Sequence, residues 1–197
     1  MMNNLYIAVE GLDNAGKSLI CGKLIEEIGG MYQKALKERP VNGELAFLLR
    51  DRMEKHVNPN DTLAMISAIN DFENDIEKKK ILEKGNLIQD RFYLSSLAYG
   101  NYSQGSKELS ALIEITKLSL VPDVIVFVNP PLEVLYERAK EESKGDLYTM
   151  TTMEEIERLY LSYIFYLNEF DNVVTVSGMD LKSDINKIKD FIGNLNR

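Results

Sequence analysis

The segment from residue 11 to residue 18 constrains this chain more than any other part of its sequence. It matches the pattern G-x-x-x-x-G-K-[ST] and stands between an apolar run at 5–9 and a helical pattern that begins at Lys17. In this context the glycines let backbone amides turn inward around a polyphosphate, because no Cβ is in the way. We therefore predict that the segment binds a nucleoside triphosphate. Its residues are Gly11, Leu12, Asp13, Asn14, Ala15, Gly16, Lys17 and Ser18.

The last two residues of this segment carry the chemistry that such a loop performs. Lys17 is expected to reach the β- and γ-phosphates, and Ser18 is expected to ligate Mg²⁺. The helix that starts here adds positive potential from its N-terminus. The sequence therefore predicts ATP and Mg²⁺ as ligands, with Lys17 as a catalytic residue.

The rest of the sequence alternates strand-like and helix-like segments. The strand-like ranges are 5–9, 31–37, 86–89, 123–128 and 173–176. Helical patterns run through 17–28, 61–84 and 132–142, and a further helix closes the chain. Residues 124–128 are continuously apolar, which suits a parallel strand buried on both faces. These patterns predict one α/β domain over residues 1–197 with a parallel sheet.

Two helical segments have further expected features. The helix at 61–84 is expected to bury an apolar stripe that includes Ile66 and Ile76, with Lys78–Lys80 on a solvated face. The helix after the polar segment 143–149 is expected to begin with a capping box. Its members are either Thr151 with Glu154 or Thr152 with Glu155.

The charge balance narrows the partners of the chain. It has 31 acidic and 23 basic side chains and a net charge of −8. A general nucleic-acid surface needs a basic patch, so we expect no nucleic-acid partner. No apolar run reaches the length of a membrane span, so we expect no membrane association. Cys21 is the only cysteine, which excludes an internal disulfide and favours a reducing, cytoplasmic location.

Several reactive or aromatic side chains are expected to be structural rather than functional. Cys21 is expected to pack in the core, and His56 is expected to lie in a solvated loop. An aromatic group near the C-terminus has helical spacing, which favours core or interface packing over a base-stacking platform. Its members are Tyr160, Tyr163, Phe165 and Tyr166.

A second pair of polar residues follows the strand expected at 86–89. Ligands of an open parallel sheet bind beyond the carboxyl ends of the strands, so Asp90 and Arg91 are expected to face the same cleft as the phosphate loop. Asp90 is expected to hold Mg²⁺ through water. Arg91 is expected to clamp a phosphate with two parallel hydrogen bonds.

Together these motifs resemble the thymidylate kinase family of nucleoside monophosphate kinases. The resemblance rests on Glu10–Asp13 before the loop, on Asp90–Tyr99 and on Pro122–Asp123. It also rests on Glu38-Arg39-Pro40 with the downstream Arg50. The resemblance implies a P-loop fold with a five-stranded parallel sheet flanked by helices. It also implies a homodimer and transfer of the γ-phosphoryl group of ATP to dTMP, giving dTDP.

The resemblance also assigns acceptor-binding residues. Asp13 would touch the sugar hydroxyl of the acceptor or orient its phosphate ligands, and Arg50 and Arg91 would hold the acceptor phosphate. Ser95 lies in the same stretch and is placed among the substrate-binding residues. Tyr99 would pack beneath the sugar and disfavour a 2′-hydroxyl. A short lid at about 140–150 carries Tyr148, which is expected to close over the acceptor.

Three departures from the family pattern matter for function. Asn14 leaves the phosphate loop without an arginine, so a catalytic cation is expected from the lid. The candidates there are Arg138, Lys144 and Lys140. Ile66 and Asn70 occupy positions where the family places an aromatic residue and an arginine against thymine. The third departure is Gly100, which replaces a commonly polar residue beside that pocket.

These departures leave two other functions open. One is a kinase of the same fold that acts on another nucleotide or on a nucleoside. The Asp90-Arg91-Phe92 sequence disfavours the nucleoside branch, in which a Glu-Arg-Ser type motif is usual. The other is a nucleotide-binding regulatory protein without catalysis, which the intact Lys17 and Ser18 disfavour.

Overall fold

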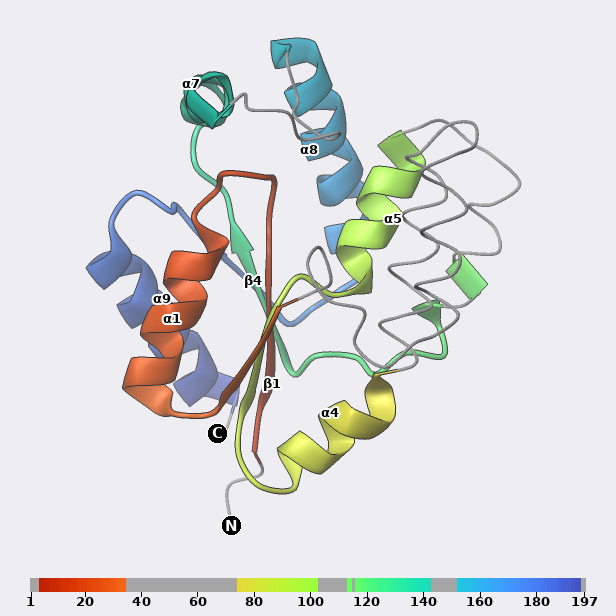
Figure 1. The fold of residues 1–197 in the computed structure, drawn as a ribbon, viewed down its shortest axis with the longest axis vertical. Helices are drawn as coiled ribbons and strands as arrows, with labels where there is room; N and C mark the ends of the chain where they lie inside the picture. The colour runs from red at the N-terminus through yellow and green to blue at the C-terminus, as the bar shows by residue number, and fades with distance from the viewer. Residues whose placement is uncertain (1–3, 35–73, 103–112, 115, 143–151, 196–197) are drawn as a thin grey trace.

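The computed structural model describes residues 4–34, 74–102, 113–114, 116–142 and 152–195 (Figure 1). Five strands form one sheet in the order β2-β3-β1-β4-β5, and every neighbouring pair is parallel. The strands are β1 (Tyr6–Glu10), β2 (Met31–Lys34), β3 (Leu87–Asp90), β4 (Val124–Val128) and β5 (Val173–Val176). The predicted α/β fold with a five-stranded parallel sheet is confirmed.

Helices cover both faces of the sheet (Figure 1). Helices α1 and α9 lie together on one face, and α4, α5 and α8 lie on the other, with α7 next to α8. Their bounds are α1 (Lys17–Ile28), α4 (Asp75–Leu82), α5 (Tyr93–Tyr102), α7 (Leu132–Glu142), α8 (Met153–Leu167) and α9 (Leu181–Leu195). The central strands β1, β3 and β4 are buried along their whole length, as continuous apolar runs require.

The register of the central strands brings their carboxyl ends to one edge of the sheet. Val9 of β1 pairs with Asp90 of β3 and with Val126 of β4. The loops that follow these three strands therefore start at the same level. This edge is where ligands of an open parallel sheet bind.

Of the two expected capping boxes, Thr152 with Glu155 is the one that begins α8. The Thr152 side chain accepts from the Glu155 amide at 3.2 Å, and the Glu155 carboxylate accepts from the Thr152 amide at 3.0 Å. Two otherwise unpaired amides at the start of α8 are thereby satisfied. The capping box therefore makes Met153 the first residue of α8.

The prediction for the helix at 61–84 is wrong in two respects. Asn74 is a turn residue and α4 begins at Asp75, so no single helix runs through the whole of 61–84; residues 61–73 lie outside the described range. Ile76 is 69% exposed, whereas Asp75, Lys78 and Ile81 are buried. Residues three apart share a helix face, and α4 turns the face of Asp75 rather than that of Ile76 toward the sheet.

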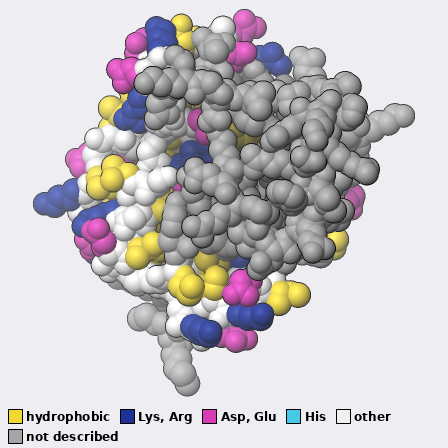
Figure 2. Space-filling view, viewed as in Figure 1, with side chains coloured by type: hydrophobic (Ala, Val, Ile, Leu, Met, Phe, Trp, Pro, Cys, Tyr) yellow, Lys and Arg dark blue, Asp and Glu magenta, His cyan; other side chains and the backbone are white. Residues whose placement is uncertain are grey.

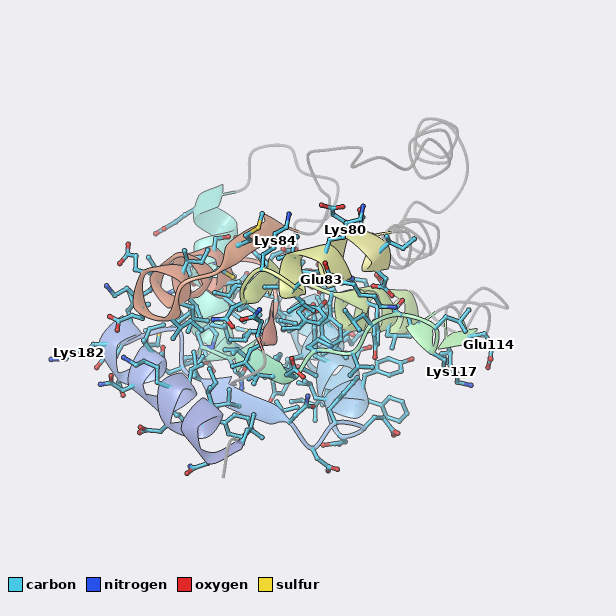
Figure 3. All side chains as sticks on the ribbon, turned by 90° about the horizontal axis from the view of Figure 1, so that it is seen from below. Lys80, Glu83, Lys84, Glu114, Lys117 and Lys182 are labelled. Carbon is cyan, nitrogen blue, oxygen red and sulfur yellow. The ribbon has the colours of Figure 1, made fainter. Side chains whose placement is uncertain are left out.

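Lys78 is also not part of a solvated face, although its neighbour Lys80 is. The Lys78 side chain is 0% exposed, and its Nζ lies 3.0 Å from Asp75 Oδ1 and 5.7 Å from the centroid of the Tyr6 ring. Asp75 Oδ2 accepts from the Leu120 amide at 2.6 Å. Lys80 lies on the outer side of α4 (Figure 3). A buried cation is tolerated here because a carboxylate neutralises it.

We expect Asp75→Ala to lower the free energy of unfolding by at least about 2 kcal/mol. The change removes the carboxylate beside buried Lys78 and the acceptor of the Leu120 amide. Urea unfolding followed by circular dichroism measures the loss. Lys80→Ala is the matched control, because its ion pair with Glu77 is exposed and should contribute less than about 1 kcal/mol. Equal stability of the two variants would contradict the structural role of Asp75.

Candidate active site

The loop after β1 passes directly against the end of β4. Gly11 has φ +144°, and a Cβ at this position would collide with the carbonyl oxygen of Val128. Asn14 has φ +63°, a left-handed conformation that asparagine adopts more readily than most residues. The loop therefore has the close approach and the reversed turns that its glycine-rich pattern predicts.

Lys17 lies inside this loop. Its side chain is buried, and Nζ donates to the Leu12 carbonyl at 2.6 Å. Burial, followed by the charge of Arg91, lowers the pKa of Lys17 to about 8, while Asp13, Asp90 and Glu10 oppose the shift. An anionic ligand in the loop would raise the pKa of Lys17 again, because nearby negative charge favours the ammonium form.

Ser18 and Asp90 meet at the start of α1. Ser18 Oγ donates to Asp90 Oδ2 at 2.8 Å, although the residues are 72 positions apart. The parallel pairing of β1 with β3 brings them together, because Asp90 ends β3 and Ser18 lies in the first turn of the helix that follows β1. The structure thus joins the two residues that the sequence predicts as metal ligands.

Asp13, Arg91 and Tyr99 form a second cluster beside the loop. Asp13 Oδ1 accepts from Arg91 Nη2 at 2.6 Å, and Asp13 Oδ2 accepts from the Tyr99 hydroxyl at 2.8 Å. Burial, followed by the charge of Asp13, raises the pKa of Tyr99 well above its usual range, so its hydroxyl stays protonated. Three of the residues predicted to contact the acceptor therefore lie together.

Ser95 lies behind Arg91 in a buried network. Its Oγ donates to Glu10 Oε2 at 2.6 Å and accepts from Arg91 Nη1 at 3.0 Å. Tyr163 from α8 is 2.8 Å from the same Oγ. Burial raises the pKa of Glu10, although Arg91 and the hydrogen bonds oppose this shift.

No role was predicted for Glu10 from the sequence, and only packing was predicted for Tyr163. Both are fully buried, and Tyr163 does pack in the core, as expected. Its hydroxyl, however, faces Arg91 at 2.9 Å. Helical spacing predicts that Tyr163 lies on the inner face of α8, but it does not predict which residue its hydroxyl contacts.

Arg138 approaches the phosphate loop from α7. Its Nη1 donates to the Asn14 carbonyl at 2.8 Å, and Nη2 lies 3.7 Å from Met179 Sδ. Lys140 instead forms an exposed ion pair with Glu137 at 2.9 Å. Of these two candidate cations, Arg138 is therefore the one at the loop.

The connection between β5 and α9 also contacts the loop, which the sequence did not predict. Gly178 has φ +66°, and a Cβ there would lie 2.6 Å from the Ala15 carbonyl oxygen. The buried Asp184 carboxylate accepts from the Ser177 amide at 2.9 Å and from the Gly178 amide at 2.8 Å. In the sequence, the only local sign of this contact is that Asp184 follows Gly178 by six residues, and that spacing is a weak signal.

Some predicted site residues lie outside the described part of the chain. They are Arg50, Ile66, Asn70, Lys144 and Tyr148, together with His56 and most of the lid at 140–150. Cys21 lies within it and is buried; burial raises the pKa of its thiol, which suits the expected packing role.

The described residues also bear on whether the chain holds a metal cluster, a membrane-spanning helix or a charged binding surface. They contain no group of three or more His, Cys, Asp or Glu side chains suited to a metal, and no helix among them is long and apolar enough to cross a membrane. On the face in Figure 2, acidic and basic side chains are interspersed over the described surface.

A phosphate loop with an internal lysine, a serine–aspartate pair and an arginine–aspartate cluster defines a P-loop phosphotransferase. The family model for thymidylate kinase matches residues 9–190, and the chain belongs to this family. It is therefore a nucleotide-binding kinase, and the reaction of its family is transfer of the γ-phosphoryl group of ATP to dTMP, giving dTDP.

Individual relatives agree with this assignment. The chain is 25% identical over 157 residues to the probable thymidylate kinase of Methanococcus vannielii, which covers 80% of this chain and 76% of that protein. It is 25% identical over 197 residues to the thymidylate kinase of Francisella tularensis, covering 94% and 93%. The solved thymidylate kinase of Candida albicans superposes with a TM-score of 0.75 at 18% identity over 98% and 93% of the chains, which shows a shared fold.

We expect Gly178→Ala to weaken ATP binding about 10-fold. The added methyl group would press on the Ala15 carbonyl and on the Val128 side chain and would displace the loop. Calorimetric titration with ATP measures the change. Gly193→Ala in α9, where an added Cβ meets nothing within 4 Å, is the control. Unchanged ATP affinity in Gly178→Ala would show that the β5–α9 connection does not set the shape of the loop.

Proposed function

We propose that this chain transfers the γ-phosphoryl group of ATP to dTMP with the residues described above. The observation that carries the proposal is that two polar clusters meet at the phosphate loop. Ser18 and Asp90 form one, and Asp13, Arg91 and Tyr99 form the other. Lys17 lies buried in the loop, where the charges of Arg91, Asp13 and Asp90 all act on it. Phosphoryl transfer needs positioning and charge neutralisation of two phosphates that meet end to end, and this arrangement offers both.

The first cluster suits the triphosphate and Mg²⁺. A hydroxyl and a carboxylate 2.8 Å apart are hard oxygen ligands, and Mg²⁺ typically takes one or two protein oxygens and completes its shell with phosphates and water. Bound Mg²⁺ would neutralise charge on the β- and γ-phosphates. Ser18 would ligate the ion directly, Asp90 would hold it through water, and Lys17 would donate to the same phosphates.

The second cluster suits a monophosphate. Nη1 of Arg91 donates to protein acceptors, and Nη2 donates to Asp13. Within the described residues, Nε and the second hydrogen of Nη2 have no protein acceptor, and together they would donate two parallel hydrogen bonds to a phosphate. Asp13 would then accept from the sugar hydroxyl, and Tyr99 would lie beneath the sugar.

Arg138 would supply the positive charge that the phosphate loop lacks at Asn14. Its contact with the Asn14 carbonyl places a guanidinium at the outer rim of the loop. Charge builds up on the transferring phosphoryl oxygens, and a cation at this rim is placed to neutralise it. Lys140 pairs with Glu137 and is the weaker candidate.

We propose further that the protein acts in the cytoplasm as a homodimer. A homodimer is what the resemblance to thymidylate kinases implies, and a single cysteine that is buried suits a reducing compartment.

An assay of ADP release across dTMP, dUMP, dCMP, dGMP and dAMP tests the function. We expect dTMP to be turned over, with at least one other acceptor within about 10-fold in kcat/KM, because exchanging ring stacking for an aliphatic contact at Ile66 loses only about 0.5–1.5 kcal/mol. Lys17→Ala is the control and should lower turnover at least ~100-fold. Failure of dTMP as an acceptor would refute the function; a strong preference for dTMP would refute only the relaxed selectivity.

We expect Arg138→Ala to lower kcat about 100-fold while both KM values change little. The reason is that its charge would act mainly on the transition state. Steady-state kinetics with ATP and dTMP separates the two parameters. Lys140→Ala, on the same helix, should retain more than half of the wild-type kcat. A raised KM for ATP with unchanged kcat would assign Arg138 to ground-state binding of the donor instead.

A further inference from the structure

Tyr163 connects α8 to the inner edge of Arg91. Its hydroxyl oxygen accepts from Arg91 Nη1 at 2.9 Å, and it lies 2.8 Å from Ser95 Oγ and 3.3 Å from Glu10 Oε2. Helix α8 packs along α5, and Ser162 donates to the Ala98 carbonyl at 2.8 Å (Figure 1). The hydroxyl therefore reaches Arg91 from a helix that is itself held in place.

Hydrogen counting fixes the direction of these bonds. The Ser95 hydroxyl hydrogen goes to Glu10 Oε2 at 2.6 Å, so Ser95 Oγ is left as an acceptor. The Tyr163 hydroxyl then donates toward Ser95 or Glu10, and its oxygen is free to accept from Arg91. Burial, followed by the charge of Glu10, raises the pKa of Tyr163 well above its usual range, so this hydrogen is always present.

The same network holds the backbone that carries Arg91. Glu10 Oε1 accepts from the Phe92 amide at 2.9 Å and from the Ser95 amide at 3.1 Å. Arg91 itself has φ +69°, a left-handed conformation that surrounding contacts must maintain in a residue other than glycine. Glu10 thus anchors the start of α5, while Tyr163, Ser95 and the Gly11 carbonyl receive the two hydrogens of Nη1.

Tyr163 is 0% exposed, so it acts through Arg91 rather than on a ligand. We propose that Tyr163 is a positioning residue: by accepting from Nη1, it turns the Nε–Nη2 edge of Arg91 toward the acceptor phosphate. The proposal rests on the acceptor role of Arg91 under the proposed function. Ser95 belongs to the same inner layer and would support acceptor binding without touching the acceptor.

Tyr163→Phe is the variant that tests this role. It removes only the hydroxyl and keeps the ring. The ring centroid lies 5.8 Å from that of Phe127 and 6.3 Å from that of Tyr99, which is edge-on to it. We expect KM for dTMP to rise about 10-fold, as loss of a hydrogen bond to a charged group implies, while the ATP dissociation constant stays within about twofold. An unchanged KM for dTMP would overturn the proposal.

Tyr166→Phe is the matched control. Tyr166 lies one turn further along α8, is also buried and packs edge-on against Phe165 at 5.1 Å, but it is not part of the Arg91 network. The Tyr166→Phe variant should leave KM for dTMP unchanged even if the substitution lowers the melting temperature of the protein. Equal increases in KM from both variants would indicate a general effect of α8 packing and would overturn the proposal.

A double-mutant cycle shows whether Tyr163 acts through Arg91. In an Arg91→Ala background, adding Tyr163→Phe should not weaken dTMP binding further by calorimetry. A second loss of similar size would show that Tyr163 acts independently of Arg91, contrary to the proposal.

A spectroscopic measurement separates this proposal from the proposed function. In the wild-type protein the Nη atoms of Arg91 should give distinct ¹⁵N signals, because the network slows rotation of the guanidinium group. Tyr163→Phe should merge them, whether or not dTMP is the acceptor. Distinct signals in the variant would overturn the positioning role, whereas lack of dTMP turnover in the wild type would overturn only the function.

Discussion

The close contact between the phosphate loop and the end of β4 is the constraint on which the rest of the site depends. Only a residue without a Cβ lets the chain turn at Gly11 against the Val128 carbonyl. This turn sets where α1 begins and hence where Lys17 and Ser18 lie. It also leaves the Gly11 carbonyl facing Arg91, which donates to it at 3.0 Å. One steric requirement therefore positions groups on both sides of the loop.

The charges of the site are arranged in advance of any ligand. Two cations, Lys17 and Arg91, lie near three carboxylates, Glu10, Asp13 and Asp90. The carboxylates Asp13, Asp90 and Glu10 raise the pKa of Lys17, yet burial and the charge of Arg91 outweigh them and lower it to about 8. The site therefore remains receptive to added negative charge. Such fixed charges stabilise a phosphoryl group without reorganisation at the moment of transfer.

Local patterns predicted the part of the structure that depends on neighbours in sequence. The loop at 11–18 and the polar residues after β3 follow from glycine stereochemistry and from apolar runs that end at a polar residue. The burial of Glu10 and Lys78 and the contacts of the Tyr163 hydroxyl were not predicted, because residues distant in sequence make these environments: Tyr163 and Glu10 are 153 positions apart. Helical periodicity also wrongly predicted that Ile76 is buried. The face of α4 that packs against the sheet instead carries the Asp75–Lys78 ion pair, which an apolar pattern in the sequence does not reveal.

Asn14 and Arg138 show how distant parts of the chain share one task. The left-handed conformation of Asn14 accompanies a carbonyl that accepts from Arg138, 124 residues further along the chain. Within the described residues, the Arg138 guanidinium makes one hydrogen bond to the loop and contacts Met179. Arg91 donates to four protein acceptors, which fix the orientation of its guanidinium group. Under the proposed function, Arg91 would be oriented in advance for the acceptor phosphate, and Arg138 would neutralise charge beside the phosphate loop.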